Sequence, residues 1–152
     1  MSNYKNIFEK IDCSSDISQI TNNITQLNLE DDNLKDLSQC FLNEIVKEMC
    51  NLYNEEKLKG KNPKSFLETL EQFLIKKKQN PVNIIDFCLN DQTNPTIQII
   101  LASCYLYGKW VQKDEHKAFI YYQKSAEMGN ARGTFNVGYC YRNGIGVEKD
   151  EH

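Results

Sequence analysis

The chain has 152 residues, of which 40% are hydrophobic and 26% charged, and its formal net charge at pH 7 is −3. This length suits one compact domain or a short stack of repeats, and the composition permits a buried core. The mild acidity and the lack of a basic stripe with interleaved aromatic residues exclude nucleic acid as an expected partner.

The first 15 residues contain no cationic segment followed by an apolar one, so a secretory signal is not predicted and a cytoplasmic location is expected. The longest apolar stretch, residues 96–108, is too short to span a membrane. A short helix is predicted over residues 16–28, because four aliphatic residues repeat there at helical spacing. We therefore expect residues 1–32 to form a partly helical N-terminal segment.

A long amphipathic helix is predicted from about residue 33 to 57. Apolar side chains recur there at steps of three and four residues: Leu34, Leu37, Phe41, Ile45, Met49 and Leu52. This helix and two shorter ones that follow it are expected to form a helical region over residues 33–92.

All three prolines of the chain follow an asparagine, at Asn62-Pro63, Asn80-Pro81 and Asn94-Pro95. Asparagine is a strong N-cap, and proline suits the first helical position because its missing N–H has no helical partner there. Each pair therefore predicts the start of a helix. No alternating, β-branched run flanked by turn residues occurs, so the fold class is predicted to be all-α.

The sequence of residues 101–116 is repeated in residues 137–152, at an offset of 36 positions. Eight of the sixteen residues are identical. In the first copy, a helix A over about 96–107 ends at Gly108, and a short loop leads to Asp114 as the N-cap of a helix B. Helix B alternates aromatic and small residues, which lets neighbouring helices approach closely. A period of this length, with helix, turn and helix, predicts an α-solenoid.

These residues resemble the Sel-one-like repeat, a relative of the tetratricopeptide repeat with the pattern A-x-x-x-L-G-x-x-Y-x-x-G-x-G-V-x-x-D-x-x-K-A-x-x-Y-Y-x-K-A-A-E-x-G. The first copy matches in Leu101, Tyr105, Gly108, Val111, Asp114, Lys117, Ala118, Tyr121, Tyr122, Lys124, Ala126, Glu127 and Gly129. The second matches in Val137, Gly138, Tyr141, Gly144, Gly146, Val147 and Asp150. The resemblance implies that residues 93–152 form helix-turn-helix repeats, the second incomplete.

The sequence differs from the family pattern in two ways, and each difference predicts a structural feature. Trp110 stands where the family has the second glycine, which predicts a wider or differently wound loop in the first repeat. The second copy stops before a helix B, so its helix A is expected to leave apolar surface uncovered, with self-association as a consequence. We also expect the sequence to be a fragment of a longer protein.

No catalytic residue, metal ligand or cofactor site is predicted. The cysteines form no CxxC pair, and His116 and His152 cannot complete a plausible zinc site with them. Cys104 and Cys140 occupy equivalent repeat positions, about one helix-pair spacing apart, which exceeds the reach of a disulfide. Both are expected to be small buried residues.

A partner-binding surface is predicted on the helix A copies, because the resemblance implies that helix A lines the concave face. It comprises Ile99, Ser103, Leu106, Phe135, Tyr139 and Arg142. Tyrosine and arginine are favoured at binding hot spots. The alternatives are an ordinary solvated groove or packing against a missing neighbour.

The predicted function is a non-catalytic adaptor or scaffold that holds a protein or peptide in its groove. The alternative is the regulatory region of a protein kinase whose catalytic domain is not in this sequence. Residues 33–90 resemble the helical segment that precedes such repeats in some fungal proteins with an upstream kinase domain. The sequence itself has no glycine-rich phosphate loop, HRD-like catalytic loop or DFG.

Overall fold

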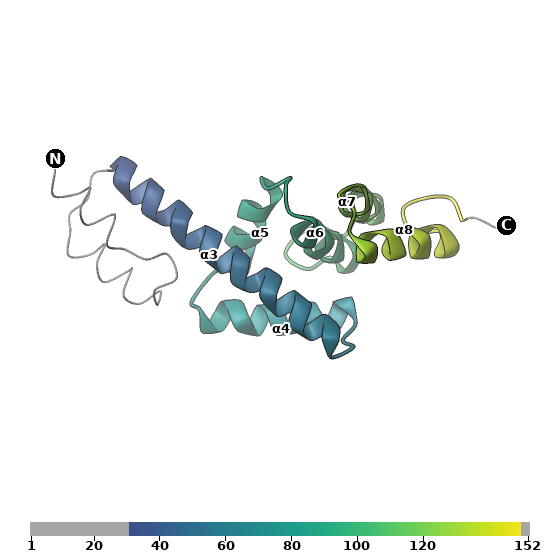
Figure 1. The fold of residues 1–152 in the computed structure, drawn as a ribbon, viewed down its shortest axis with the longest axis horizontal. Coiled ribbons are helices and arrows are strands. Elements are labelled where there is room, and N and C mark those ends of the chain that lie inside the picture. The colour runs from purple at the N-terminus through teal and green to yellow at the C-terminus, as the bar shows by residue number, and fades with distance from the viewer. Residues whose placement is uncertain (1–30, 150–152) are drawn as a thin grey trace. The chain divides into compact units, whose positions relative to one another are not determined.

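The computed structural model describes residues 31–149, and this part of the chain contains six helices and no strand (Figure 1). The predicted all-α class is therefore confirmed. The chain divides into two units, residues 1–48 and 49–152, and the boundary falls within the first described helix. The helix predicted over 16–28 lies outside the described residues.

Helix α3 (Asp31–Leu58) is the predicted long amphipathic helix, extended by one or two residues at each end. Three members of its apolar stripe, Leu37, Ile45 and Met49, are buried. The other three, Leu34, Phe41 and Leu52, are half-buried. The helical spacing of the stripe thus identified the buried side of α3.

The three Asn-Pro pairs start α4 (Pro63–Lys76), α5 (Pro81–Leu89) and α6 (Pro95–Tyr107), as predicted. Each asparagine side chain accepts a hydrogen bond from a backbone N–H of the first turn: Ser65 N at 2.8 Å, Val82 N at 2.9 Å and Thr96 N at 2.9 Å. These bonds satisfy donors that the helix leaves without a partner.

Helix α6 forms the core of the second unit. Every side chain from Ile97 to Tyr105 is buried, because α4, α5 and α7 (Glu115–Glu127) all contact this helix. The buried face of α4 contributes Phe66, Leu67, Leu70 and Leu74, and that of α5 contributes Ile84, Ile85 and Cys88. Burying one such large apolar side chain contributes about 1.5–3 kcal/mol.

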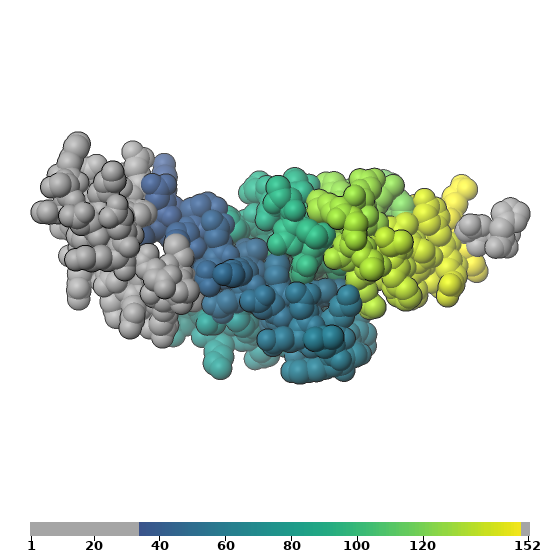
Figure 2. Space-filling view, in the orientation of Figure 1, coloured from purple at the N-terminus to yellow at the C-terminus, as the bar shows by residue number. Residues whose placement is uncertain are grey.

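The repeat is visible as three helices side by side, α6, α7 and α8 (Ala131–Asn143) (Figure 1). Helix α7 contacts both of the others, so the two copies of helix A pack on one helix B. In the space-filling view, α7 and α8 form one continuous green-to-yellow surface (Figure 2). The predicted helix-turn-helix packing of the first repeat is confirmed.

Small residues set the close approach of these helices. A Cβ atom added at Gly133 of α8 would lie 2.6 Å from the backbone nitrogen of Ala126 and 2.8 Å from Ser125 Oγ. On its other side, Ser125 Oγ donates to the carbonyl of Pro95 at 2.9 Å. The small side chains of α7 therefore allow both copies of helix A to pack closely, as expected.

The two loops after helix A wind alike. Gly108 (φ 64°, ψ 38°) and Gly144 (φ 65°, ψ 39°) end their helices in the left-handed conformation. Two residues later, Trp110 has φ 63° and Gly146 has φ 68°. The expectation of a differently wound loop at Trp110 is therefore wrong. A tryptophan can adopt this conformation at a cost of about 1 kcal/mol or more.

Candidate protein-binding surface

One side of α8 exposes large aromatic side chains. Phe135 is 61% exposed and Tyr139 is 48% exposed. With the exposed Arg142, they stand four and three residues apart and thus share one helical face, here called the groove face. Exposed aromatic residues that gather in one place often mark an interaction site.

The six residues predicted for partner binding differ in their exposure to solvent. Phe135, Tyr139 and Arg142 are exposed, and Leu106 is half-buried. Ile99 and Ser103 are only 1% and 2% exposed. The predicted exposed face is therefore wrong for these two residues, while binding by the other four stays a prediction.

The reason for the burial of Ile99 and Ser103 is tertiary. Ser103 Oγ donates to the Ile99 carbonyl at 3.0 Å, so its hydroxyl is satisfied inside α6. Helix α6 is surrounded by other helices, whereas α8 contacts α7 on one side. Equivalent positions in the two repeats therefore have different exposures.

A second face of α8 is open where its counterpart is closed. Thr134, Gly138 and Tyr141 are exposed and are here called the uncovered face. Their counterparts 36 residues earlier, Gln98, Ala102 and Tyr105, are buried. Apolar surface on the helix A of the second repeat is thus exposed, as expected.

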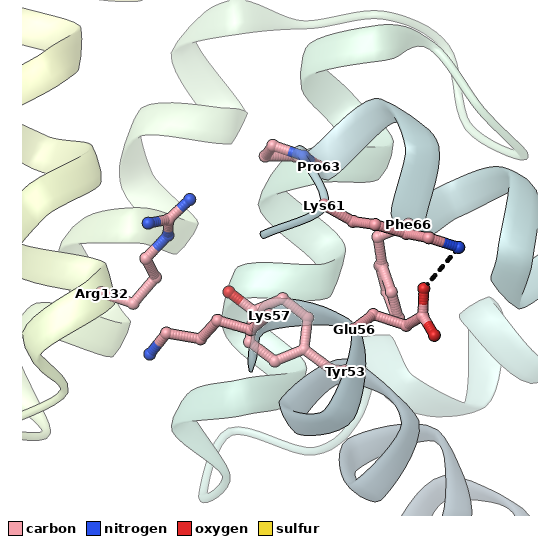
Figure 3. Close-up of a pocket in the computed structure, with 7 residues that line it drawn as sticks. All are labelled: Tyr53, Glu56, Lys57, Lys61, Pro63, Phe66 and Arg132. Carbon is pink, nitrogen blue, oxygen red and sulfur yellow. Dashed lines mark ion pairs between the residues drawn. The ribbon is translucent and has the colours of Figure 1, made fainter. Parts of the chain in front are cut away.

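A small pocket lies between the C-terminal part of α3, the start of α4 and the start of α8 (Figure 3). Its lining comprises Tyr53, Glu56, Lys57, Lys61, Pro63, Phe66 and Arg132. The Tyr53 ring meets the Phe66 ring edge-on, with centroids 5.2 Å apart and planes at 89°. This contact holds the Tyr53 phenol at the pocket wall.

Some charged residues of this pocket form ion pairs, and others do not. Glu56 binds Lys61 at 2.6 Å and Lys59 at 3.3 Å, and the hydrogen bond from Lys61 lowers the Glu56 pKa most. Within residues 31–149, Lys57 and Arg132 form no ion pair. Figure 3 shows Arg132 and Lys57 on the side away from the Glu56–Lys61 pair, with the Tyr53 hydroxyl pointing toward them.

The repeated unit of helix A, glycine turn and helix B matches a family model, the Sel1 repeat. Two Sel1 repeats occupy residues 98–130 and 131–152. The predicted resemblance is thereby confirmed, and the matched residues make up the C-terminal third of the chain. Searches among the curated proteins and among the solved structures each found no match.

In the first Sel1 repeat, α6 is helix A and α7 is helix B, and in the second, α8 is helix A. The groove face and the uncovered face both belong to the second Sel1 repeat. The pocket joins that repeat to α3 and α4, which lie before the matched residues.

Sequence reasoning missed four residues of this surface. Tyr107, at the end of α6, is 43% exposed, and burial and then the nearby Tyr139 phenol raise its pKa. Tyr53, Lys57 and Arg132 line the pocket. Of the three residues that line the pocket, only Arg132 lies within a Sel1 repeat, and no motif or spacing connects it with Tyr53 and Lys57, which stand 75 or more positions earlier.

The cysteines of the second unit lack the character of nucleophiles. Burial raises the pKa of Cys50 to about 11 and those of Cys88 and Cys104 to about 12, so these thiols stay protonated at neutral pH. Cys104 and Cys140 are buried free thiols, as predicted. His116 is exposed, and its Nδ1 lies 3.0 Å from the Gly146 carbonyl.

No group of three histidine, cysteine, aspartate or glutamate residues among residues 31–149 could hold a metal ion. No helix in this part of the chain is both long and apolar enough to cross a membrane.

Proposed function

We propose that this chain is a non-catalytic adaptor or scaffold of the cytoplasm, which binds a protein or peptide through its Sel1 repeats. Sel1 repeats are generally protein-interaction modules. The proposed contact surface is the groove face of α8 together with the half-buried Leu106 and the exposed Tyr107.

The exposure of Phe135 and Tyr139 carries this proposal. Both rings stand on a helix that is already formed, so a partner would meet them without ordering the backbone. Large aromatic side chains lose little conformational entropy on binding, and with arginine they dominate many interface hot spots. The neighbouring Arg142 completes such a set.

The chemistry of the described residues also favours binding over catalysis. Cys88 and Cys104 are buried with raised pKa values, so neither offers the thiolate that a nucleophilic mechanism requires. The exposed residues of the groove face are aromatic and cationic, and none of the three is a general base at neutral pH.

The test is affinity capture from an extract of the source cells with the full chain as bait. The double variant Phe135→Ala/Tyr139→Ala should lose specific partners that the unmodified chain retains, as quantified by mass spectrometry. The matched control is Ile75→Ala/Val82→Ala, which removes two exposed apolar side chains from α4 and α5. Partners retained equally by both variants would contradict the proposal.

Self-association is a second candidate, favoured by the uncovered face. Tyr141 is 43% exposed although its counterpart Tyr105 is buried, so a second copy could cover it. Sedimentation velocity over a range of concentrations should show dimers, and Tyr141→Glu should abolish them. The control Val82→Glu, placed on α5, should leave the association unchanged. A monomer at all concentrations would exclude this candidate.

A further inference from the structure

The pocket beside α8 contains a polar site that the proposed function does not explain. Tyr53, Lys57 and Arg132, here called the cationic notch, bring a phenol hydroxyl and two cations to one wall of it (Figure 3). Tyr53 is buried, Arg132 is half-buried and Lys57 is exposed, so water screens the Arg132 charge less than it screens a fully exposed charge. Burial raises the Tyr53 pKa, and the Arg132 charge opposes that rise.

The cationic notch has no anion of its own among the described residues. The one carboxylate that lines the pocket, Glu56, is bound to Lys61 at 2.6 Å and to Lys59 at 3.3 Å. Lys57 and Arg132 therefore line the pocket as two like charges, and no carboxylate of residues 31–149 pairs with either of them. An added carboxylate would relieve their repulsion and accept their hydrogen bonds.

The notch continues directly into the groove face. The Arg132 guanidinium lies over the Phe135 ring, with its central carbon 5.1 Å from the ring centroid. Phe135 is followed by Tyr139 one helical turn later. From Arg132 to Tyr139, seven residues of helix span about 10 Å. Cationic and aromatic contacts thus lie within reach of one short peptide.

We propose that the cationic notch binds an aspartate or glutamate side chain of a partner peptide whose apolar side chain packs on Phe135 and Tyr139. The partner is therefore an acidic, amphipathic segment of another protein. This inference rests on the proposed function, because it identifies the chemistry of the partner that the groove face binds.

Two observations favour an acidic peptide over a small free anion. The aromatic side chains beside the notch need an apolar partner, which an inorganic anion does not provide. The guanidinium can donate two parallel hydrogen bonds to a carboxylate, and the Tyr53 hydroxyl can donate a third. The notch carries two cations although the whole chain has a net charge of −3, so it attracts an acidic segment locally.

The experiment is a selection of phage-displayed random peptides on the immobilised full chain. Peptides of about 16 residues are long enough to cover the roughly 15 Å from Arg132 to Arg142. The enriched peptides should combine at least one aspartate or glutamate with a large apolar residue. Selection on Lys57→Glu/Arg132→Glu should no longer favour acidic residues.

The most enriched peptide is then synthesised with a fluorescent label, and its affinity is measured by fluorescence polarisation. Charge reversal in the notch should weaken binding at least about tenfold, and replacing the peptide's acidic residue by its amide should weaken it similarly. The matched control Lys64→Glu/Lys76→Glu reverses two exposed cations of α4 and should change the affinity less than about twofold. Lys57→Gln/Arg132→Gln serves as a second notch variant with less risk to folding.

The outcomes separate this inference from the proposed function. Binding that is lost in Phe135→Ala/Tyr139→Ala but unchanged in both notch variants overturns the acidic partner and leaves the proposed function intact. Binding that is unchanged in all three variants overturns both. A selection that enriches no peptide overturns the acidic peptide partner, and the affinity capture then decides the proposed function by itself. Displacement of the peptide by inorganic phosphate but not by excess glutamate would assign the notch to phosphate and overturn the carboxylate.

Discussion

Tyr105 of α6 stacks on Tyr121 of α7, with ring centroids 5.5 Å apart and an angle of 7° between the planes. Its counterpart in the second Sel1 repeat, Tyr141, instead meets Phe119 of the same α7 edge-on and stays 43% exposed. One tyrosine is thus covered by the helix B of its own repeat, and the other contacts the helix B of the preceding repeat. This difference identifies the side of α8 on which further packing is open.

Adding a helix B after His152 should therefore stabilise the protein. We expect a chain extended by a copy of residues 117–129 to gain about 1–2 kcal/mol by covering Tyr141 and its neighbours. The melting temperature, followed by circular dichroism, should rise by several degrees. An extension of the same composition in scrambled order is the control. Equal melting temperatures for the two extended chains would show that α8 does not accept a helix B.

Gly146 should resist substitution although Trp110 occupies the same loop position in the first repeat. A Cβ atom at Gly146 would collide with the Glu115 carbonyl oxygen, and its φ of 68° is also unfavourable for alanine. Gly146→Ala should lower the free energy of unfolding by about 1–3 kcal/mol in urea titrations. Gly138→Ala provides the contrast, because the site has open space and lies within α8. That variant should gain about 0.5–1 kcal/mol, and a loss there would contradict the described packing.

The N-cap of α7 should contribute measurably to stability. Asp114 accepts a hydrogen bond from the Lys117 backbone N–H at 3.0 Å. Asp114→Ala removes this acceptor and should lower the free energy of unfolding by about 1 kcal/mol. Asp114→Asn keeps an acceptor and should lose far less. If both variants lose the same amount, the charge of Asp114 and not its hydrogen bond stabilises the helix.

Alkaline pH should weaken the fold through the buried thiols. Burial raises the pKa of Cys104 from 9.0 to about 12, so between these values the folded chain keeps a proton that the unfolded chain releases. The contribution is fully present below about pH 9 and is lost as the pH rises toward 12, by up to about 1.4 kcal/mol per pH unit. Urea unfolding at about pH 8, 9.5 and 10.5 should show this decline.

The matched variant for the pH experiment is Cys104→Ala, which removes the titrating group from the centre of α6. Its stability at neutral pH should be lower because a buried side chain is truncated. Its decline with pH should nevertheless be shallower than that of the unmodified chain. Parallel pH profiles would assign the alkaline loss to other groups.

Local sequence signals located almost every described helix. The Asn-Pro pairs gave the starts of α4, α5 and α6, because both residues act within the first turn. Gly108 and Gly144 gave the ends of both helix A copies, because a left-handed residue ends a helix locally. The helical spacing of apolar residues likewise gave the buried side of α3. Each of these signals depends on neighbours within a few residues.

Exposure at the candidate site could not be predicted in the same way. The repeat assigned Ile99 and Phe135 equivalent positions, yet the first is buried and the second is exposed. Their surroundings differ because α4 and α5 pack against α6, and these two helices carry no repeat motif. The restriction at Gly146 is also tertiary, since this residue lies against the backbone of Glu115 and His116 at the start of α7.

The sequence by itself determined the helices, their caps and the 36-residue stride of the repeat, because these depend on backbone conformation and on nearby residues. Only the tertiary structure decided which faces of the helix A copies stay open, because burial depends on helices far away in the chain. It also placed Tyr53 and Lys57 of α3 with Arg132 of α8 in one pocket. Charges 75 residues apart become a binding site only when packing brings them together.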